Sequence, residues 1–216
     1  MPINVYCWAA YLQGTFPMRQ MDFNATKFVH AIKGERMNGY GHVPVRGVSM
    51  RLDNQNASQA ARWFGLWAAG QLAGLVPMPT RIALIPIPNS GAVTGGPGDF
   101  KTKLLADEIL PHLGARASVA PVLTWREPMR RSHDGGTRDP CELFENLHCA
   151  GYVPEAVHIV VDDVKTTGGH IQACAAKLGA VGAPVVIAVC AAKTEYTQLP
   201  NTFVVPMHQI DDFQPV

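Results

Sequence analysis

From residue 82 onward, short apolar runs alternate with segments of helical periodicity, and this alternation limits the chain to few folds. Strands that alternate with helices are typical of an α/β domain whose sheet is mainly parallel and flanked by helices. In such sheets ligands bind beyond the carboxyl ends of the strands. The expected strands are residues 82–87, 120–124, 157–161, 185–190 and 203–205, and the expected helices are residues 100–113 and 170–178.

The chain before the Pro-Met-Pro breaker at residues 77–79 follows a different pattern. Residues 22–33 predict a short helix, and residues 56–75 predict a longer one with apolar side chains three and four positions apart. We therefore expect residues 1–78 to form an N-terminal extension with a helical or hood-like role. Residues 79–216 then form the α/β domain.

Charge and apolar length argue against several kinds of partner. With 18 Lys and Arg against 17 Asp and Glu, the net charge is +1, so charge does not indicate a nucleic-acid partner. The longest apolar stretch, residues 183–192, is far short of the roughly 20 residues that span a bilayer. The first residues lack the pattern of a secretory signal, so we expect a cytoplasmic protein without a membrane partner.

Aromatic residues and cysteines favour structural roles. The stripe of Trp63 and Trp67 favours a core position, and if exposed it would be a contact in a homodimer. Five cysteines are scattered without a C-x-x-C pair, which fits neither a disulfide framework nor a common zinc motif. We expect reduced thiols that are mostly buried.

The run His-Ile-Val-Val-Asp-Asp-Val-Lys-Thr-Thr-Gly-Gly-His at residues 158–170 carries the clearest chemistry. It passes from an apolar strand through Asp162 and Asp163 into a loop of small residues and then a helix. Glycine permits the dihedral angles that turn backbone amides around a phosphate, and the following helix adds its positive N-terminal end. The carboxylates suit ribose hydroxyls and hydrated magnesium. The plainer alternative is a solvated turn followed by an ordinary helix cap.

This run closely resembles the phosphoribosyl pyrophosphate (PRPP) signature of type I phosphoribosyltransferases. The resemblance implies the fold of that family, with Asp162 and Asp163 at the ribose hydroxyls and orienting Mg²⁺ through water. It also implies a Thr/Gly loop, residues 165–170, around the 5'-phosphate. The loop residues are Lys165, Thr166, Thr167, Gly168, Gly169 and His170. His170 departs from the usual Thr or Ser and would alter ligand preference.

The wider order of motifs is similar to the ComF-like branch of this family. Residues 85–88 (Ile-Pro-Ile-Pro), 99–106 and 144–147 stand in the matching order before and around the expected mobile segment. The zinc-binding cysteine pairs of that branch are absent. The arginine that usually precedes the helix entry is replaced by Gly98, so pyrophosphate contact would fall to Lys101 or Lys103.

Two further segments are candidates for pyrophosphate contact. The glycine-rich loop, residues 89–99, occupies the family's pyrophosphate position, with Ser90 and Gly91 the better candidates. The hood segment, residues 126–145, lacks apolar periodicity and would close over the site with an arginine. An ordinary solvated loop is the alternative. The candidate arginines are Arg126 and Arg130, with Arg131 and Arg138 in the same segment.

The resemblance implies transfer of a phosphoribosyl group between PRPP and a nitrogenous base, with magnesium. The alternatives are a non-catalytic protein that binds PRPP or a nucleotide, with a regulatory or ComF-like DNA-uptake role, or action on a different phosphorylated sugar. The missing arginine favours the non-catalytic alternative, and His170 points to a different phosphorylated sugar. Intact Asp162-Asp163 and Thr-Thr-Gly favour ligand binding in each case.

Overall fold

The computed structural model describes residues 1–96, 100–130, 135–213 and 215 of the chain. The predictions that involve Gly98, Asp99 and Arg131 concern residues outside these ranges. Among the described residues, no helix is both long and apolar enough to cross a membrane.

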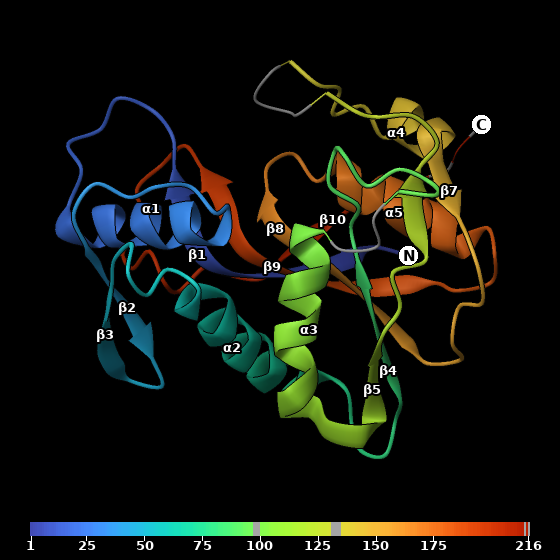
Figure 1. The fold of residues 1–216 in the computed structure, drawn as a ribbon, viewed down its shortest axis with the longest axis horizontal. Coiled ribbons are helices and arrows are strands. Elements are labelled where there is room, and N and C mark those ends of the chain that lie inside the picture. The colour runs from blue at the N-terminus through green and yellow to red at the C-terminus, as the bar shows by residue number, and fades with distance from the viewer. Residues whose placement is uncertain (97–99, 131–134, 214, 216) are drawn as a thin grey trace.

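A six-stranded sheet runs through the middle of the molecule in the order β10-β1-β9-β8-β4-β5 (Figure 1). Every neighbouring pair is parallel except β1 with β10, which is antiparallel. The predicted α/β class with a mainly parallel sheet is therefore confirmed. The strands are β1 (Ile3–Leu12), β4 (Ile82–Pro86), β5 (Ala117–Val119), β8 (Val157–Lys165), β9 (Val185–Glu195) and β10 (His208–Ile210).

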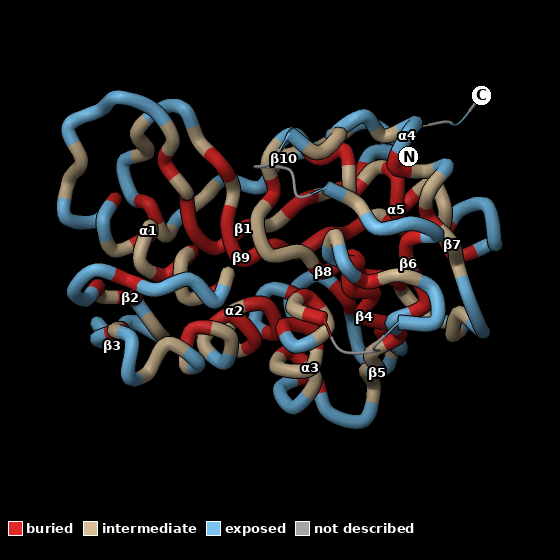
Figure 2. Tube along the Cα trace, turned by 45° about the horizontal axis from the view of Figure 1, so that its top comes forward, coloured by how far each residue is buried: buried red, intermediate tan, exposed pale blue. Residues whose placement is uncertain are grey.

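Helices cover both faces of this sheet and bury two apolar clusters. One cluster lies under α1, α2 and α3, and the other lies under α4 and α5 (Figures 1 and 2). The helices are α1 (Gln20–Ile32), α2 (Gln59–Leu75), α3 (Lys101–Leu113), α4 (Pro140–Asn146) and α5 (Gly169–Gly179), with a 3-10 turn at Gly114–Arg116. Two short antiparallel pairs complete the fold, β2 (Gly41–Val45) with β3 (Val48–Leu52) and β6 (Leu123–Trp125) with β7 (Leu147–Cys149).

The N-terminal part of the chain contributes a strand that the sequence did not predict. β1 is inserted between β9 and β10, in parallel register with β9 through pairs such as Cys7 with Cys190. Alternation of buried and partly buried residues is limited to the first part of this strand, and residues 7–10 are buried without a break. The division of the chain after residue 78 remains a prediction, although β1 joins the sheet formed by later residues.

Two predicted strands are wrong in position. Residues 203–205 form no strand, because Phe203 instead packs its ring against Trp8 and Phe28, at centroid distances of 5.9 and 6.0 Å. The last strand is β10. Residues 120–124 are interrupted by Pro121, so the chain forms β5 before the proline and β6 after it.

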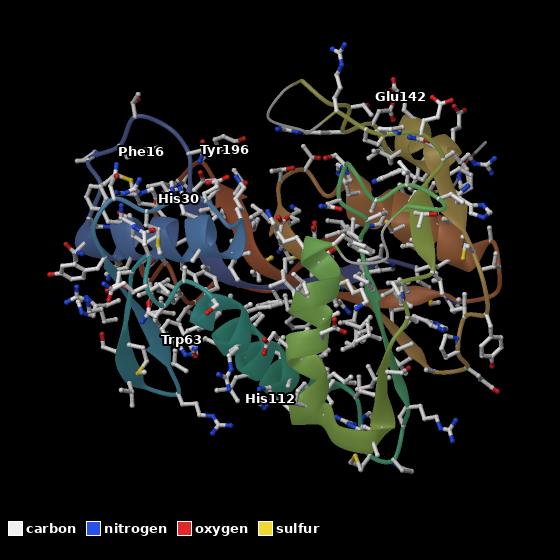
Figure 3. All side chains as sticks on the ribbon, in the orientation of Figure 1. Phe16, His30, Trp63, His112, Glu142 and Tyr196 are labelled. Atoms are coloured by element: carbon white, nitrogen blue, oxygen red, sulfur yellow. The ribbon has the colours of Figure 1, made fainter. Side chains whose placement is uncertain are left out.

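The aromatic stripe of α2 contributes to the core. Trp67 stacks against Trp8 at 6.0 Å, and both Trp67 and Trp63 are partly buried against the cluster under α1 to α3. The side chain of Trp63 lies beside α2 (Figure 3). The exposed aromatic face that would have suggested a homodimer contact is therefore not formed, and the homodimer stays a prediction.

Candidate functional site

The two adjacent carboxylates lie where β8 loses one of its neighbours. The pairing of β8 with β4 ends at Val161, and the backbone N–H of Ile87 still donates to the Val161 carbonyl at 3.0 Å. Beyond Val161, β8 continues beside β9 as far as Lys165. The sequence placed the end of the strand at residue 161, and this was wrong because β9 is long enough to pair with Asp162, Val164 and Lys165 as well. Asp162 and Asp163 are thus held on a rigid strand.

The carboxyl group of Asp162 is in an unfavourable environment for its charge. Burial, followed by the charge of Asp163, raises the pKa of Asp162 to about 8. The only hydrogen bonds to the pair come from the next backbone amides, Asp163 N to Asp162 Oδ1 at 2.8 Å and Val164 N to Asp163 Oδ1 at 2.6 Å, within the described residues. Neither carboxylate forms an ion pair with a described residue. Such uncompensated acids are enriched at functional sites.

The Thr/Gly loop leads from these carboxylates into α5. Gly168 is the N-cap of α5 with φ of +101°, a left-handed conformation that disfavours other residues. The Thr167 hydroxyl accepts a long hydrogen bond of 3.4 Å from the Gly169 N–H. Backbone amides in the first turn of a helix lack helical partners and suit an anion. The loop therefore ends in a glycine-capped helix N-terminus, and its role as a phosphate cradle stays a prediction.

Lys165 is the first residue of the loop, and the end of its side chain lies beside Gly168 of the same loop. Its Cε lies 3.3 Å from the point where a Cβ on Gly168 would stand. Burial, and then the charge of Lys193, lower the pKa of Lys165. Lys165 is opposite Lys193 of β9, and Ile210, two residues after His208 in β10, lies 3.4 Å from the same Cβ position, so the two lysines and His208 gather beside the loop.

His170 connects the loop to Trp125, which sequence reasoning did not assign to the site, and to Arg138, which it named in the hood segment without choosing it. Its ring meets the edge of the Trp125 ring at 6.0 Å. Burial lowers the pKa of His170, the charge of Asp163 opposes this shift, and the charge of Arg138 adds to it. The sequence did contain a signal for the position of Arg138. Asp139 followed by Pro140 is a strong helix start, and this start of α4 holds the preceding residue, Arg138, beside α5.

The hood segment contacts the loop through its backbone. A Cβ on Gly169 would lie 2.1 Å from the carbonyl oxygen of Arg138, so only glycine allows this approach. The hood segment is also more ordered than predicted, because α4 occupies its last part and the Asp139 carboxylate accepts from the Cys141 N–H at 3.0 Å. Arg138 is therefore the described hood arginine that lies beside His170.

The glycine-rich loop after β4 is fixed around Trp125. The indole N–H of Trp125 donates to the carbonyls of Pro88 and Asn89, at 3.1 and 2.9 Å. The Met129 N–H donates to the Ser90 carbonyl at 2.9 Å, while Gly91 is exposed with open space around it. Because Trp125 contacts both this loop and His170, the structure brings the Ser90 segment and the Thr/Gly loop to one edge of the sheet.

The other predicted pyrophosphate residues are engaged elsewhere or exposed. The Lys101 ammonium donates to the Lys33 carbonyl at the end of α1. Arg126 lies near Lys177, whose pKa it lowers after the larger effect of burial. Arg130 is exposed at the border of the described residues.

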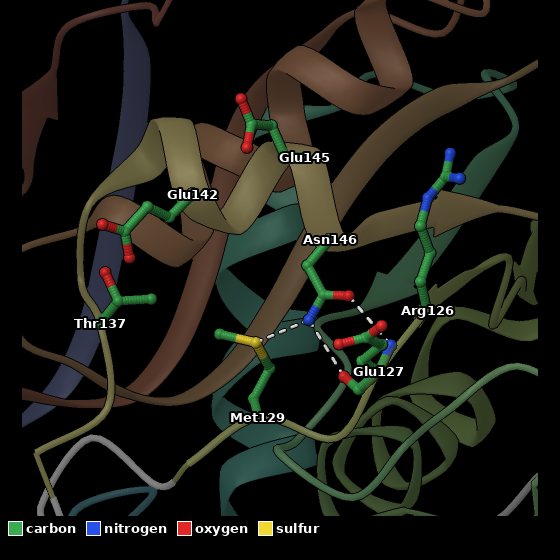
Figure 4. A pocket seen from close by; sticks show the side chains of 7 residues that line it. All are labelled: Arg126, Glu127, Met129, Thr137, Glu142, Glu145 and Asn146. Atoms are coloured by element: carbon green, nitrogen blue, oxygen red, sulfur yellow. Dashed lines mark hydrogen bonds between the residues drawn. The ribbon is translucent and has the colours of Figure 1, made fainter.

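Arg126 also lines a cavity of about 420 Å³ beside α4, in which Asn146 hydrogen bonds to both backbone groups of Glu127 (Figure 4). The Arg126 guanidinium points away from Glu142 and Thr137 on the other side of that cavity. Its charge is therefore not directed at these residues, and its contact with a ligand stays a prediction.

A magnesium ion would have few direct protein ligands here. Among residues 1–96, 100–130 and 135–213, no three His, Cys, Asp or Glu side chains gather in a way that could hold a metal. Magnesium usually keeps several waters and takes one or two carboxylates together with phosphate oxygens of a substrate. Asp162 and Asp163 fit that pattern, with the ion held through water.

Comparison with known proteins adds no relative. No protein-family model matches the chain, and no curated protein matches it.

Proposed function

We propose that the protein has a type I phosphoribosyltransferase-like fold and binds PRPP, or another ribose 5'-phosphate compound, together with magnesium in the cytoplasm. We further propose that it transfers the phosphoribosyl group to or from a nitrogenous base. One observation carries the proposal. Two carboxylates with no cationic partner in the described part of the chain stand on β8 directly before a glycine-capped helix N-terminus, at one edge of a parallel sheet.

The proposed roles follow from the chemistry of each group. Asp162 and Asp163 accept hydrogen bonds from the vicinal hydroxyls of the ribose, which would offset the repulsion between them. The backbone amides of residues 166–169 bind the 5'-phosphate, helped by the positive end of α5. His170 adds a donor whose ring is oriented by its contact with Trp125.

Transfer requires cleavage of the anomeric C–O bond. Positive charge then builds on the ribose and negative charge on pyrophosphate, so charge stabilisation supplies most of the catalysis. Magnesium, when bound, would offset charge on the departing pyrophosphate. The Asp pair would hold the sugar, and the backbone around Ser90 and Gly91 would face the leaving group. No side-chain nucleophile is required.

The test is calorimetric titration of PRPP into the protein in the presence of magnesium. We compare the wild type with an Asp162→Asn/Asp163→Asn variant and with Asp53→Asn, which alters a carboxylate that follows β3 and pairs with Arg51. Loss of hydrogen bonds to charged groups should weaken binding in the double variant by about 100-fold, and Asp53→Asn should bind normally. Absence of PRPP binding to the wild type would contradict the proposal.

A non-catalytic binding protein is the second candidate, with a regulatory or DNA-uptake role. It is favoured by the engagement of Lys101 with Lys33 and by the position of Arg126 beside Lys177, which leave fewer cations for pyrophosphate. Measuring pyrophosphate release with a panel of bases separates the two candidates. PRPP binding without any release favours the second, and release with one base favours transfer.

A further inference from the structure

A second group of cationic side chains lies beyond the Thr/Gly loop, where the carboxyl ends of β8 and β9 run side by side (Figure 1). Lys165 of β8 is directly opposite Lys193 of β9, and Lys165 is only 8% exposed. Like charges directly opposite each other on neighbouring strands are destabilising. The pair therefore needs compensating negative charge.

The described residues supply only part of this compensation. Lys193 forms an ion pair with Glu195 at 2.8 Å, and both side chains are largely buried. Lys165 forms no hydrogen bond or ion pair with a residue in the described part of the chain. Two ammonium groups thus share one carboxylate. A buried charge that lacks a partner is costly, so proteins seldom retain one without a use.

His208 of β10 completes the group. Both of its ring nitrogens are buried, and neither has a hydrogen-bond partner among the described residues. Burial and the charges of Lys165 and Lys193 lower the pKa of His208 to about 4. The ring is therefore neutral near pH 7 and offers one N–H donor. An unpartnered donor beside an uncompensated ammonium is the arrangement that an oxyanion would satisfy.

We propose that Lys165, Lys193 and His208 form a binding site for a phosphate group, separate from the backbone amides of the Thr/Gly loop. The site adjoins that loop because Lys165 Cε lies 3.3 Å from the Cβ position of Gly168. The phosphate group is either free inorganic phosphate or a phosphate of a ligand that also occupies the loop. Neither Asp162 nor Asp163 takes part, so the site does not depend on the proposed transfer activity.

The experiment follows the ring C–H signals of His208 by NMR during titration with inorganic phosphate, at constant ionic strength and without magnesium. A His208→Gln variant assigns the signals. We expect a saturable shift in the wild type. Lys193→Met should weaken the apparent affinity at least about tenfold, because it removes a charge-assisted hydrogen bond. Lys27→Met removes a lysine of α1 and should have no effect.

A second titration with ribose 5-phosphate identifies the source of the phosphate group. If the phosphate belongs to a loop-bound ligand, ribose 5-phosphate shifts the His208 signals at lower concentration than inorganic phosphate. Thr167→Val should then weaken only the ribose 5-phosphate effect. Equal effects of the two probes, both insensitive to Thr167→Val, indicate a site for free phosphate.

Two results would overturn the proposal. One is a His208 shift that does not saturate or that is identical in Lys193→Met, provided that this variant unfolds at a temperature close to that of the wild type. The other is loss of the inorganic phosphate effect in Thr167→Val, which would place the anion on the loop alone. Failure of PRPP to bind leaves these titrations unchanged, so the two proposals fail separately.

Discussion

Asp22, at the start of α1, and Asp162, in β8, are both withdrawn from solvent, but their carboxylates have different surroundings. Asp22 accepts hydrogen bonds from the backbone and guanidinium of Arg19, between 2.9 and 3.0 Å, and from Gln198 at 3.1 Å. The guanidinium holds the pKa of Asp22 below its usual value. Asp162 has no cationic partner among the described residues, and burial together with the charge of Asp163 raises its pKa to about 8. One carboxylate is satisfied by the fold, and the other is left for a ligand.

Two glycines also differ in their surroundings, one where α2 packs on α3 and the other at the carboxyl edge of the sheet. A Cβ on Gly65 of α2 would lie 2.1 Å from the Glu108 carbonyl of α3, and a Cβ on Gly169 would lie 2.1 Å from the Arg138 carbonyl. Glu108 lies inside a helix that is packed on α2, whereas Arg138 lies outside any helix or strand. The same close contact therefore supports packing in one region and positions the hood segment in the other.

Gly65→Ala should have the largest effect on stability. The new methyl group would force α2 and α3 apart, and such overpacking costs about 3 kcal/mol of unfolding free energy. Urea denaturation measures the change. The matched control is Gly70→Ala in the same helix, where nothing lies within 4 Å of the new methyl group. The control should gain up to about 1 kcal/mol from helix propensity, and equal effects of the two variants would contradict this role for Gly65.

Asp22→Asn should destabilise the protein at neutral pH by about 2 kcal/mol, because it weakens several hydrogen bonds to a charged group. A depressed pKa means that the stabilisation is present above the unfolded pKa of about 4 and is lost as pH falls through the lower folded value. The difference between variant and wild type should therefore shrink at pH 3. Urea midpoints at pH 7 and pH 3 test this, and a difference that grows in acid would argue against it.

Asp162→Asn should have the opposite effect on stability to Asp22→Asn. A raised pKa means that the contribution of Asp162 is fully present below pH about 4 and is lost as pH rises through about 8. The variant should therefore be more stable than the wild type at pH 9, by about 1 kcal/mol after allowance for solvent screening, and similar at pH 5. Urea denaturation at the two pH values is the measurement. If the variant were less stable than the wild type at pH 9, Asp162 would stabilise the fold as Asp22 does, and the contrast between the two carboxylates would be wrong.

Gly169→Ala should change stability least, by less than about 1 kcal/mol, because the carbonyl that it meets belongs to no helix or strand and can move away. The displaced hood segment should instead alter the surroundings of His170 and Trp125. We expect a change in tryptophan fluorescence or in the His170 NMR signals at nearly constant unfolding free energy. A loss of stability as large as that of Gly65→Ala would show that both glycines serve packing alone.

The sequence was most informative where local pattern and tertiary role agree. Helices α3 and α5 begin and end within a residue of their predicted bounds, because their apolar spacing matches the face that they bury. The glycine cap at Gly168 was also anticipated, since few residues other than glycine adopt its backbone conformation. The misplaced strand at residues 203–205 shows the limit. Apolar residues there fill the core beside Trp8 without joining the sheet.

The candidate site also has one part that the sequence predicts and another that depends on the tertiary structure. The sequence by itself determined the order of carboxylates, Thr/Gly loop and helix, because these residues are neighbours in the chain and their geometry is local. Only the tertiary structure decided that Arg138 and Trp125 lie beside His170, that Lys101 turns to Lys33, and that Lys165 joins Lys193 and His208. These contacts join residues from separate elements, and their positions follow from how the strands and helices pack together.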